Sequence, residues 1–304
     1  MITVVIPTYN RGAIVVETAE CLFALNPPPD AIIVVDQTKD RNPVLTEWDR
    51  QGRIRLIRLD QPSIPHAMNV GLLAAATPVV LYLDDDVEPS SALIAAHARA
   101  HGDESIWAVV GQILQPGQEP AHFDPPEDDL EFHFNHDTGR FVANVMAGNL
   151  SVKREHAVNV GGFDENYIGV AYRFESDFAL RLVAAGGKVW FAPEAGLRHL
   201  KLRSGGLRSF GDHRSSPSPA HAAGDYYFAM QHRRPLWRYV VRRLRRNVLT
   251  RYHLGHPWAV PTKVIGELRG LLLARKLAAG GRRLIPPAGR RNGAAIDGVP
   301  QKTS

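Results

Sequence analysis

Short apolar runs of strand length alternate with helix-like segments over the first 86 residues of this chain. The apolar runs occupy residues 2–6, 31–35, 54–59 and 79–83, and they are rich in Val, Ile and Leu. Between them, apolar residues recur at the spacing of one face of a helix. Consecutive strands joined through helices pair in parallel, so this alternation predicts an α/β fold with a mostly parallel sheet flanked by helices.

Acidic residues follow three of these runs at the end where the chain leaves the strand. Asp36 follows the second run, Asp60 the third, and Asp84, Asp85 and Asp86 the fourth. The carboxyl ends of parallel strands meet at one edge of a sheet, where ligands of such folds bind. Carboxylates this close together repel unless a cation or strong donors neutralise them. The pattern therefore favours a metal and nucleotide site over a solvated acidic turn.

Several short motifs occur in an order that resembles the family 2 inverting glycosyltransferases with the GT-A (Rossmann-like) fold. They are Val5–Arg11, Val34–Asp36, Ala67–Gly71, Leu83–Asp86, Gly148–Asn149, Gly161–Glu165 and Glu175–Arg181. Each motif alone is weak, but the ordered set is specific. The resemblance implies a GT-A catalytic domain over residues 1–210. It also implies transfer of a sugar from a nucleotide-diphosphate donor, with UDP and dTDP sugars as the first candidates, to a hydroxyl acceptor.

The resemblance also implies roles for individual residues. Those expected to bind the nucleotide sugar are Thr8, Asn10, Arg11, Asp36, Asp60, Asn69, Asp84, Asp85 and Asn149. A Mn²⁺ or Mg²⁺ ion is expected with Asp86, Asp84 and His199 as ligands, because hard oxygen donors suit both ions and a neutral imidazole can join them. The basic loop 198–206 is expected either to close over the phosphates or to be an ordinary solvated loop.

The family places its catalytic base in a Glu-Asp element at the start of a helix. When the chain is aligned with that element through Asp177, Phe178 and Arg181, Glu175 takes the position of the base and Phe174 that of the glutamate. Glu175 keeps a carboxylate that can take the acceptor proton. Asp177 is the rival, although its four-residue spacing from Arg181 favours an ion pair on the helix surface. The alternative function is a non-catalytic nucleotide-sugar-binding or membrane scaffold protein with a degenerate base.

The segment 115–144 is rich in Pro, Asp, Glu, His and Phe and has poor periodicity. It predicts loops and a hairpin that recognise the acceptor, because specificity varies in loops carried by a rigid sheet. His133, His136 and Asp137 could be drawn as a second metal site. No further ligand spacing supports such a site, and we interpret these residues as surface residues.

Positive charge is concentrated late in the chain. Residues 225–283 contain fourteen Lys and Arg against two acids, although the net charge of the whole chain is only +5. Apolar and aromatic residues interleave with the arginines, which predicts a basic amphipathic helical extension over 211–284. It suits either an anionic membrane surface or a solvated helix pair packed on the catalytic domain or in a dimer. Nucleic acid is not expected as a partner, since no nucleic-acid-binding fold accompanies the charge. Residues 285–304 are expected to be a disordered tail.

The composition and the apolar runs indicate where in the cell the protein acts. The single cysteine, Cys21, excludes an intramolecular disulfide. We find no signal peptide and no apolar run long enough to span a membrane. We therefore expect a cytoplasmic protein, peripheral at the inner face of the cell membrane. Its expected acceptor is a glycan or lipid-linked glycan in polysaccharide or cell-envelope biosynthesis.

Overall fold

A computed structural model describes residues 1–124, 132–202, 205–206 and 217–286. Its strands are β1 (Ile2–Thr8), β2 (Ala31–Asp36), β3 (Arg55–Arg58), β4 (Val79–Leu83), β5 (Val87–Pro89), β6 (Ile106–Leu114), β7 (Arg140–Val142), β8 (Asn149–Lys153) and β9 (Lys188–His199). Its helices are α1 (Ala13–Phe23), α2 (Pro43–Arg50), α3 (Ile64–Ala74), α4 (Leu93–Ala100), α5 (Arg154–Asn159), α6 (Phe174–Ala184), α7 (Ala220–Gln231), α8 (Leu236–Arg243), the π-helix η1 (Leu244–Val248), α9 (Arg251–Gly255) and α10 (Ala259–Ala279).

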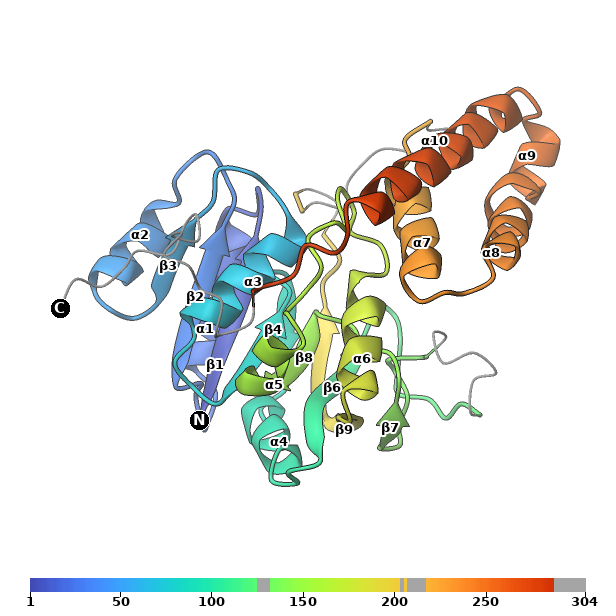
Figure 1. Cartoon of the computed structure of the whole chain (residues 1–304). Coiled ribbons are helices and arrows are strands. Elements are labelled where there is room, and N and C mark those ends of the chain that lie inside the picture. Colours follow the sequence, from blue (N-terminus) through green and yellow to red (C-terminus); the bar gives the residue numbers. More distant parts are fainter. Residues whose placement is uncertain (125–131, 203–204, 207–216, 287–304) are drawn as a thin grey trace.

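The strands form one mixed sheet in the order β3-β2-β1-β4-β8-β6-β9-β5, and β7 pairs with β9. The first four strands are mutually parallel, as the alternation in the sequence predicted. The far half is mixed, because β8 enters antiparallel between β4 and β6 while β6 and β9 are parallel. Figure 1 shows the sheet running through the molecule with helices on both of its faces.

Strand alternation divides the apolar side chains between two cores. On β1, Val5 contributes to the core beneath α3, α5 and α6, while Val4 and Ile6 contribute to the core beneath α1, α2 and α4. Because successive residues of a strand point to opposite faces, one β-branched run can supply both cores. This fixes the register of the central strands and so the position of the side chains at their carboxyl ends.

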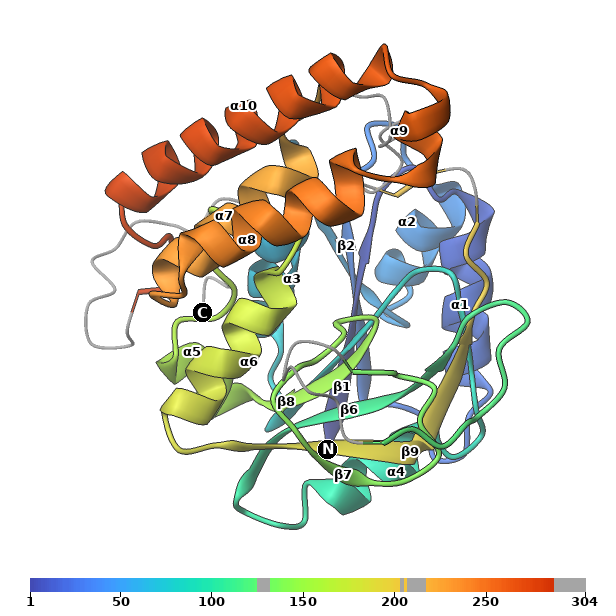
Figure 2. The same cartoon turned by 90° about the vertical axis from the view of Figure 1, so that its right-hand side faces the viewer.

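The predicted helical extension forms a group of its own. Figures 1 and 2 show α7, α8, α9 and α10 gathered at one side of the sheet. From α10 the chain then returns to the part of the molecule built on the sheet, where the amide of Ile285 donates to the carbonyl of Gly161 at 2.8 Å. Ile285 is buried, so the docked chain extends past the predicted end of the extension at residue 284. The predicted tail beyond residue 286 and the start of the extension at 211–216 lie outside the described residues. None of the described helices has both the length and the apolar character needed to cross a membrane.

Candidate active site

The aspartate triplet follows β4 and meets the end of β1, because these two parallel strands are neighbours. Asp85 is buried, and its carboxylate accepts a hydrogen bond of 2.6 Å from the Thr8 hydroxyl. Arg11 Nε lies 3.5 Å from the same carboxylate. Burial raises the pKa of Asp85 to about 7, even though Thr8 and Arg11 act in the opposite direction. The carboxyl ends of the parallel strands therefore do converge, as predicted.

Asp84, Asp86 and His199 lie together at the same edge. His199 Nε2 is 3.1 Å from Asp86 Oδ1 and 4.0 Å from Asp84 Oδ2. Burial tends to raise the pKa of Asp86, but the hydrogen bond and charge of His199 outweigh it and the net shift is downward. His199 thus lies between two carboxylates, and carboxylate oxygens with an imidazole nitrogen are donors of the kind that suit Mn²⁺ or Mg²⁺.

Arg11 presents donors that the described residues leave unused. Its Nη2 lies 3.3 Å from Asp86, and its Nε lies 3.5 Å from Asp85 without forming a hydrogen bond. Its Nη1 is buried and has no hydrogen-bond partner in the described part of the chain. Buried polar groups are normally hydrogen-bonded, so these two nitrogen atoms indicate an anionic ligand such as a diphosphate. The amide of Gly206 donates to Tyr9 at 2.8 Å, which brings part of the predicted basic loop over this turn.

A cavity of about 590 Å³ opens between the ends of β1 and β2 and the helices α1 and α2. Thr8, Asn10 and Asp36 line it, as expected for a nucleoside pocket. Arg58 and the amide of Thr38 both donate to Asp36, at 2.6 and 2.8 Å. Neither partner of Asp36 was predicted from the sequence.

Asp60 lies exposed after β3 and is not among the residues that line the 590 Å³ cavity. The structure therefore does not bring Asp60 together with Asp36 at the predicted nucleoside pocket. Its predicted role in binding the nucleotide sugar has no contact in the structure to support it.

Glu175 lies in the first turn of α6 and faces a cavity of about 340 Å³. Its carboxylate accepts from the amide of Ala147 at 2.9 Å. The next residue, Gly148, lies directly against Asp84, since a Cβ atom at Gly148 would come 2.4 Å from Asp84 Oδ2. Only the short turn 146–148, directly before β8, thus separates the candidate base from the candidate metal ligands.

Asp177 is fully buried and lies away from this cavity. It accepts from Arg181 Nε at 2.8 Å and from His232 Nε2 at 2.9 Å, and it also binds Arg282. Burial opposes its ionisation, but His232 and the two arginines outweigh burial and lower its pKa to about 2. The predicted ion pair with Arg181 is present. It is buried rather than on the helix surface, because α7 and the returning C-terminal segment cover it.

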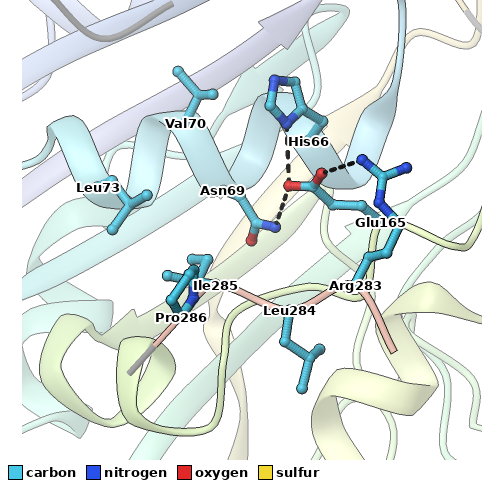
Figure 3. Close-up of a pocket in the computed structure, with 9 residues that line it drawn as sticks. All are labelled: His66, Asn69, Val70, Leu73, Glu165, Arg283, Leu284, Ile285 and Pro286. Atoms are coloured by element: carbon cyan, nitrogen blue, oxygen red, sulfur yellow. Dashed lines mark hydrogen bonds and ion pairs between the residues drawn. The ribbon is translucent and has the colours of Figure 1, made fainter. Parts of the chain in front are cut away.

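Two asparagines predicted to bind the nucleotide sugar are engaged elsewhere. The fully buried Asn149 donates to the carbonyl of Ala195 at 2.7 Å, and its oxygen pairs with His97 at 2.9 Å. Asn69 donates to Phe163 and to Glu165, at 2.8 and 2.9 Å. Figure 3 shows Asn69 directed toward Glu165 in a cavity that residues 283–286 of the returning segment also line. The structure does not bring these two side chains to the metal ligands, because both hold loops and strands together.

Three potential metal ligands lie together in the middle segment, where the sequence predicted only surface residues. They are His122, His136 and Asp137, whose ligand atoms lie within 4.8 Å of one another. His133 is not part of this group, because it stacks on Phe123. Nδ1 of His136 already accepts from the Thr138 amide at 3.0 Å, so this nitrogen would have to exchange its partner to bind an ion.

The chain is similar to known proteins in sequence and in fold. The family model described as Glycosyl transferase family 2 matches residues 3–157. A comparison with curated protein sequences gives no match. TarS residues 1–349 from S. aureus, solved in complex with UDP-GlcNAc, is 14% identical with a TM-score of 0.63, over 91% of this chain and 83% of that one.

Two further solved structures share the fold. The mannosyltransferase PcManGT from Pyrobaculum calidifontis, in complex with GDP-Man and Mn²⁺, is 19% identical with a TM-score of 0.54, over 92% of this chain and 79% of that one. GalNAc-T7 with UDP, GalNAc and Mn²⁺ is 17% identical with a TM-score of 0.56, over 78% of this chain. This chain spans only 52% of the GalNAc-T7 chain.

Proposed function

Because the chain belongs to glycosyl transferase family 2, we propose that it moves a sugar from a nucleotide-diphosphate donor to a hydroxyl of a glycan or lipid-linked acceptor, with inversion at the anomeric carbon. UDP and dTDP sugars are the first donor candidates. The observation that carries the proposal is the proximity of the Asp84, Asp86 and His199 cluster to Glu175 across residues 146–148. Structures of similar fold were solved with UDP-GlcNAc and with GDP-Man.

Each part of the site has a role in this chemistry. The cavity beside Thr8 and Asp36 would hold the nucleoside, and the unused N–H groups of Arg11 would bind the diphosphate. A divalent cation held by the metal-ligand cluster would stabilise the charge that develops on the leaving diphosphate. Glu175 would accept the proton of the attacking hydroxyl. Inversion needs only this one base, because the acceptor attacks the face opposite the leaving group.

The phenylalanine at the position of the family's glutamate is a packing residue. Phe174 is fully buried, with its ring centroid 5.5 Å from that of Phe163. Phe174 fills the core beneath α6, and Glu175 still lines the 340 Å³ cavity. This arrangement supports a working base over the degenerate-site alternative.

Metal dependence tests the proposed reaction. Release of UDP, dTDP and GDP is measured from a panel of nucleotide sugars with Mn²⁺ or Mg²⁺ and with a chelator. We expect release from a single donor class, and we expect Asp86→Ala to lower it by about 100-fold or more, since a metal contributes several kcal/mol of charge stabilisation. Asp137→Ala is the matched control in the second ligand group. Loss of release in Asp137→Ala with full activity in Asp86→Ala would place the metal elsewhere.

The C-terminal helices support a peripheral association with an anionic membrane at the cytoplasmic face. Trp237, Leu249, Leu254 and Trp258 are each more than half exposed among the basic residues of α8 to α10. Apolar and aromatic side chains beside Lys and Arg suit the boundary of an anionic bilayer.

Co-sedimentation with vesicles containing anionic lipid tests this association. We expect the full chain to bind at low salt and to dissociate as salt rises, because screening weakens contacts of surface charges. A Trp237→Ser, Trp258→Ser double variant should bind several-fold more weakly, whereas Phe141→Ser, an exposed aromatic on β7, should bind like wild type. Equal binding of neutral and anionic vesicles would contradict the electrostatic part.

A further inference from the structure

The helix that carries Glu175 begins from a turn with an unusual backbone conformation. Ala171 has a φ of 50° and Arg173 a φ of 75°, so two residues with a Cβ atom are left-handed directly before α6. The carbonyl of Arg173 accepts from the amide of Asp177, at 3.0 Å, in the first turn of the helix. Such conformations are disfavoured for residues other than glycine and persist only where neighbouring groups hold them. The direction in which α6 starts, and with it the position of Glu175, therefore depends on what packs against residues 171–173.

Helix α7 of the extension packs against this turn with its backbone. A Cβ atom at Gly224 would lie 2.2 Å from the carbonyl oxygen of Tyr172, so the approach requires glycine. Glycine in a helix interior is less favourable than alanine, and this close contact accounts for its presence here. The next residue, Asp225, is buried and accepts from Nε of Arg173 at 3.1 Å. Two successive residues of α7 thus hold the turn, one through its backbone and one through its carboxylate.

Asp225 is itself held in place by the rest of the extension. Arg243 of α8 donates to its second oxygen at 2.7 Å. Glu267 of α10 accepts from the same arginine at 2.7 and 2.9 Å, and all three side chains are buried. A buried ion pair adds little to stability after its desolvation cost, but separating its partners is strongly unfavourable. The chain of pairs from α10 to α7 therefore restricts Asp225 to one position.

Helix α7 also contacts α6 on the other side of Glu175. His232, the residue that ends α7, donates from Nε2 to Asp177 at 2.9 Å. Arg173 and Asp177 stand two residues before and two residues after Glu175, which lines the 340 Å³ cavity between them in sequence. A general base acts only within hydrogen-bond reach of the proton that it accepts. A small displacement of this turn would therefore lower turnover.

We propose that α7 positions the catalytic base, by holding the turn from which α6 places Glu175 beside the acceptor. Asp225 acts through the side chain of Arg173, and Gly224 acts through the backbone of the same turn. Both are positioning residues, since neither lines the cavity that contains Glu175. The proposal rests on the proposed function, because it concerns the base of the same catalytic site. It gives the helical extension a part in the reaction itself, beyond any contact with a membrane.

Replacing Asp225 with Asn tests the positioning by kinetics. The variant leaves Arg173 without its charged acceptor. We expect kcat to fall about 10-fold or more, since misplacing a group by about 1 Å can cost about 10²-fold. KM for the donor should stay at the wild-type value, because neither residue lines the 590 Å³ cavity. In a Glu175→Gln background the same substitution should cause no further loss. A wild-type kcat, or losses that multiply in the double variant, would overturn the proposal.

The matched control is Tyr227→Phe, on the same helix. The Tyr227 hydroxyl donates to Asp164 at 2.8 Å, so this variant also removes a buried hydrogen bond between α7 and the chain before α6. The bond lies outside the turn 171–173, and we expect kcat to equal that of wild type. An equal loss of kcat in Tyr227→Phe would show that any loosening of the extension lowers turnover, which contradicts a specific role for Asp225.

Hydrogen exchange measures the same turn without catalysis. We expect the peptide that covers residues 171–178 to exchange faster in Asp225→Asn than in wild type or in Tyr227→Phe. Gly224→Ala forces α7 away from the carbonyl of Tyr172 without leaving a charge unpaired, so it should have the same effect even if Asp225→Asn does not fold. Unchanged exchange in the folded variants overturns the proposal. Faster exchange without donor turnover in any protein keeps the contact of α7 with the turn and contradicts the proposed function.

Discussion

Replacing Glu175 with Gln is expected to lower turnover by about 10²- to 10⁴-fold, the range by which a positioned base accelerates proton transfer. The amide cannot accept the acceptor proton, but it keeps the length of the side chain and can still accept from the amide of Ala147. Donor binding should remain close to that of wild type, because Glu175 does not line the 590 Å³ cavity. Steady-state transfer rates and the dissociation constant of UDP separate these two effects.

The matched control for this variant is Glu155→Gln, which removes an exposed carboxylate from the first turn of α5. It should transfer sugar at the wild-type rate. Full activity of Glu175→Gln would show that another group takes the proton. Equal loss of transfer and of donor affinity would indicate that the substitution disturbs the segment 146–148 rather than the chemistry.

The first half of the sheet follows from local sequence. The runs at 2–6 and 79–83 alternate so that each feeds two cores, and their shared direction brings their carboxyl ends together. The contact of Thr8 with Asp85 is the consequence. It could be predicted because it depends on strand adjacency and on the general rule that ligands bind at these ends.

Other parts of the site depend on pairings that local patterns do not report. Arg58 reaches Asp36 because the two residues are opposite each other in the register of β2 and β3. The one sequence signal for this contact was the presence of an arginine, Arg58, within a run predicted to be a strand. His199 was placed by resemblance, and it reaches Asp86 because β9 pairs with β5 at this edge.

The asparagine motifs show why a matched residue need not contact the ligand. Asn149 opens β8, which is inserted between β4 and β6, so its side chain is enclosed by neighbouring strands and by α4. Asn69 faces the loop that carries Phe163, and its three hydrogen bonds are used there. The motif pattern cannot separate residues that shape the fold from residues that touch the substrate.

The returning C-terminal segment is the feature least visible in the sequence. Its amide at Arg283 donates to Asp164 at 3.0 Å, and its Arg282 binds Asp177 on α6. The helical extension is therefore joined to the helix that carries Glu175 through buried carboxylates. Long-range ion pairs of this kind depend on the chain reversing its course after α10, which no local periodicity indicates.

Replacing Asp177 with Asn is expected to destabilise the fold by about 3–5 kcal/mol, because removing one partner of a buried ion pair leaves the others uncompensated. Arg181, Arg282 and His232 would each lose a charged acceptor. Chemical unfolding at neutral pH measures the change in the free energy of unfolding. Glu47→Gln, which removes an exposed ion pair with Arg50 on α2, is the control and should unfold like wild type.

Acid dependence gives this prediction a second readout. The pKa of Asp177 falls from 3.8 to about 2 on folding, so its ionised form stabilises the fold above pH 4 and that contribution is lost as the pH falls from about 4 to about 2. The difference in stability between wild type and Asp177→Asn should therefore shrink over this window, by about 2 kcal/mol. A variant that is as stable as wild type but has lost transfer activity would instead make Asp177 the base, and Glu175 a structural carboxylate.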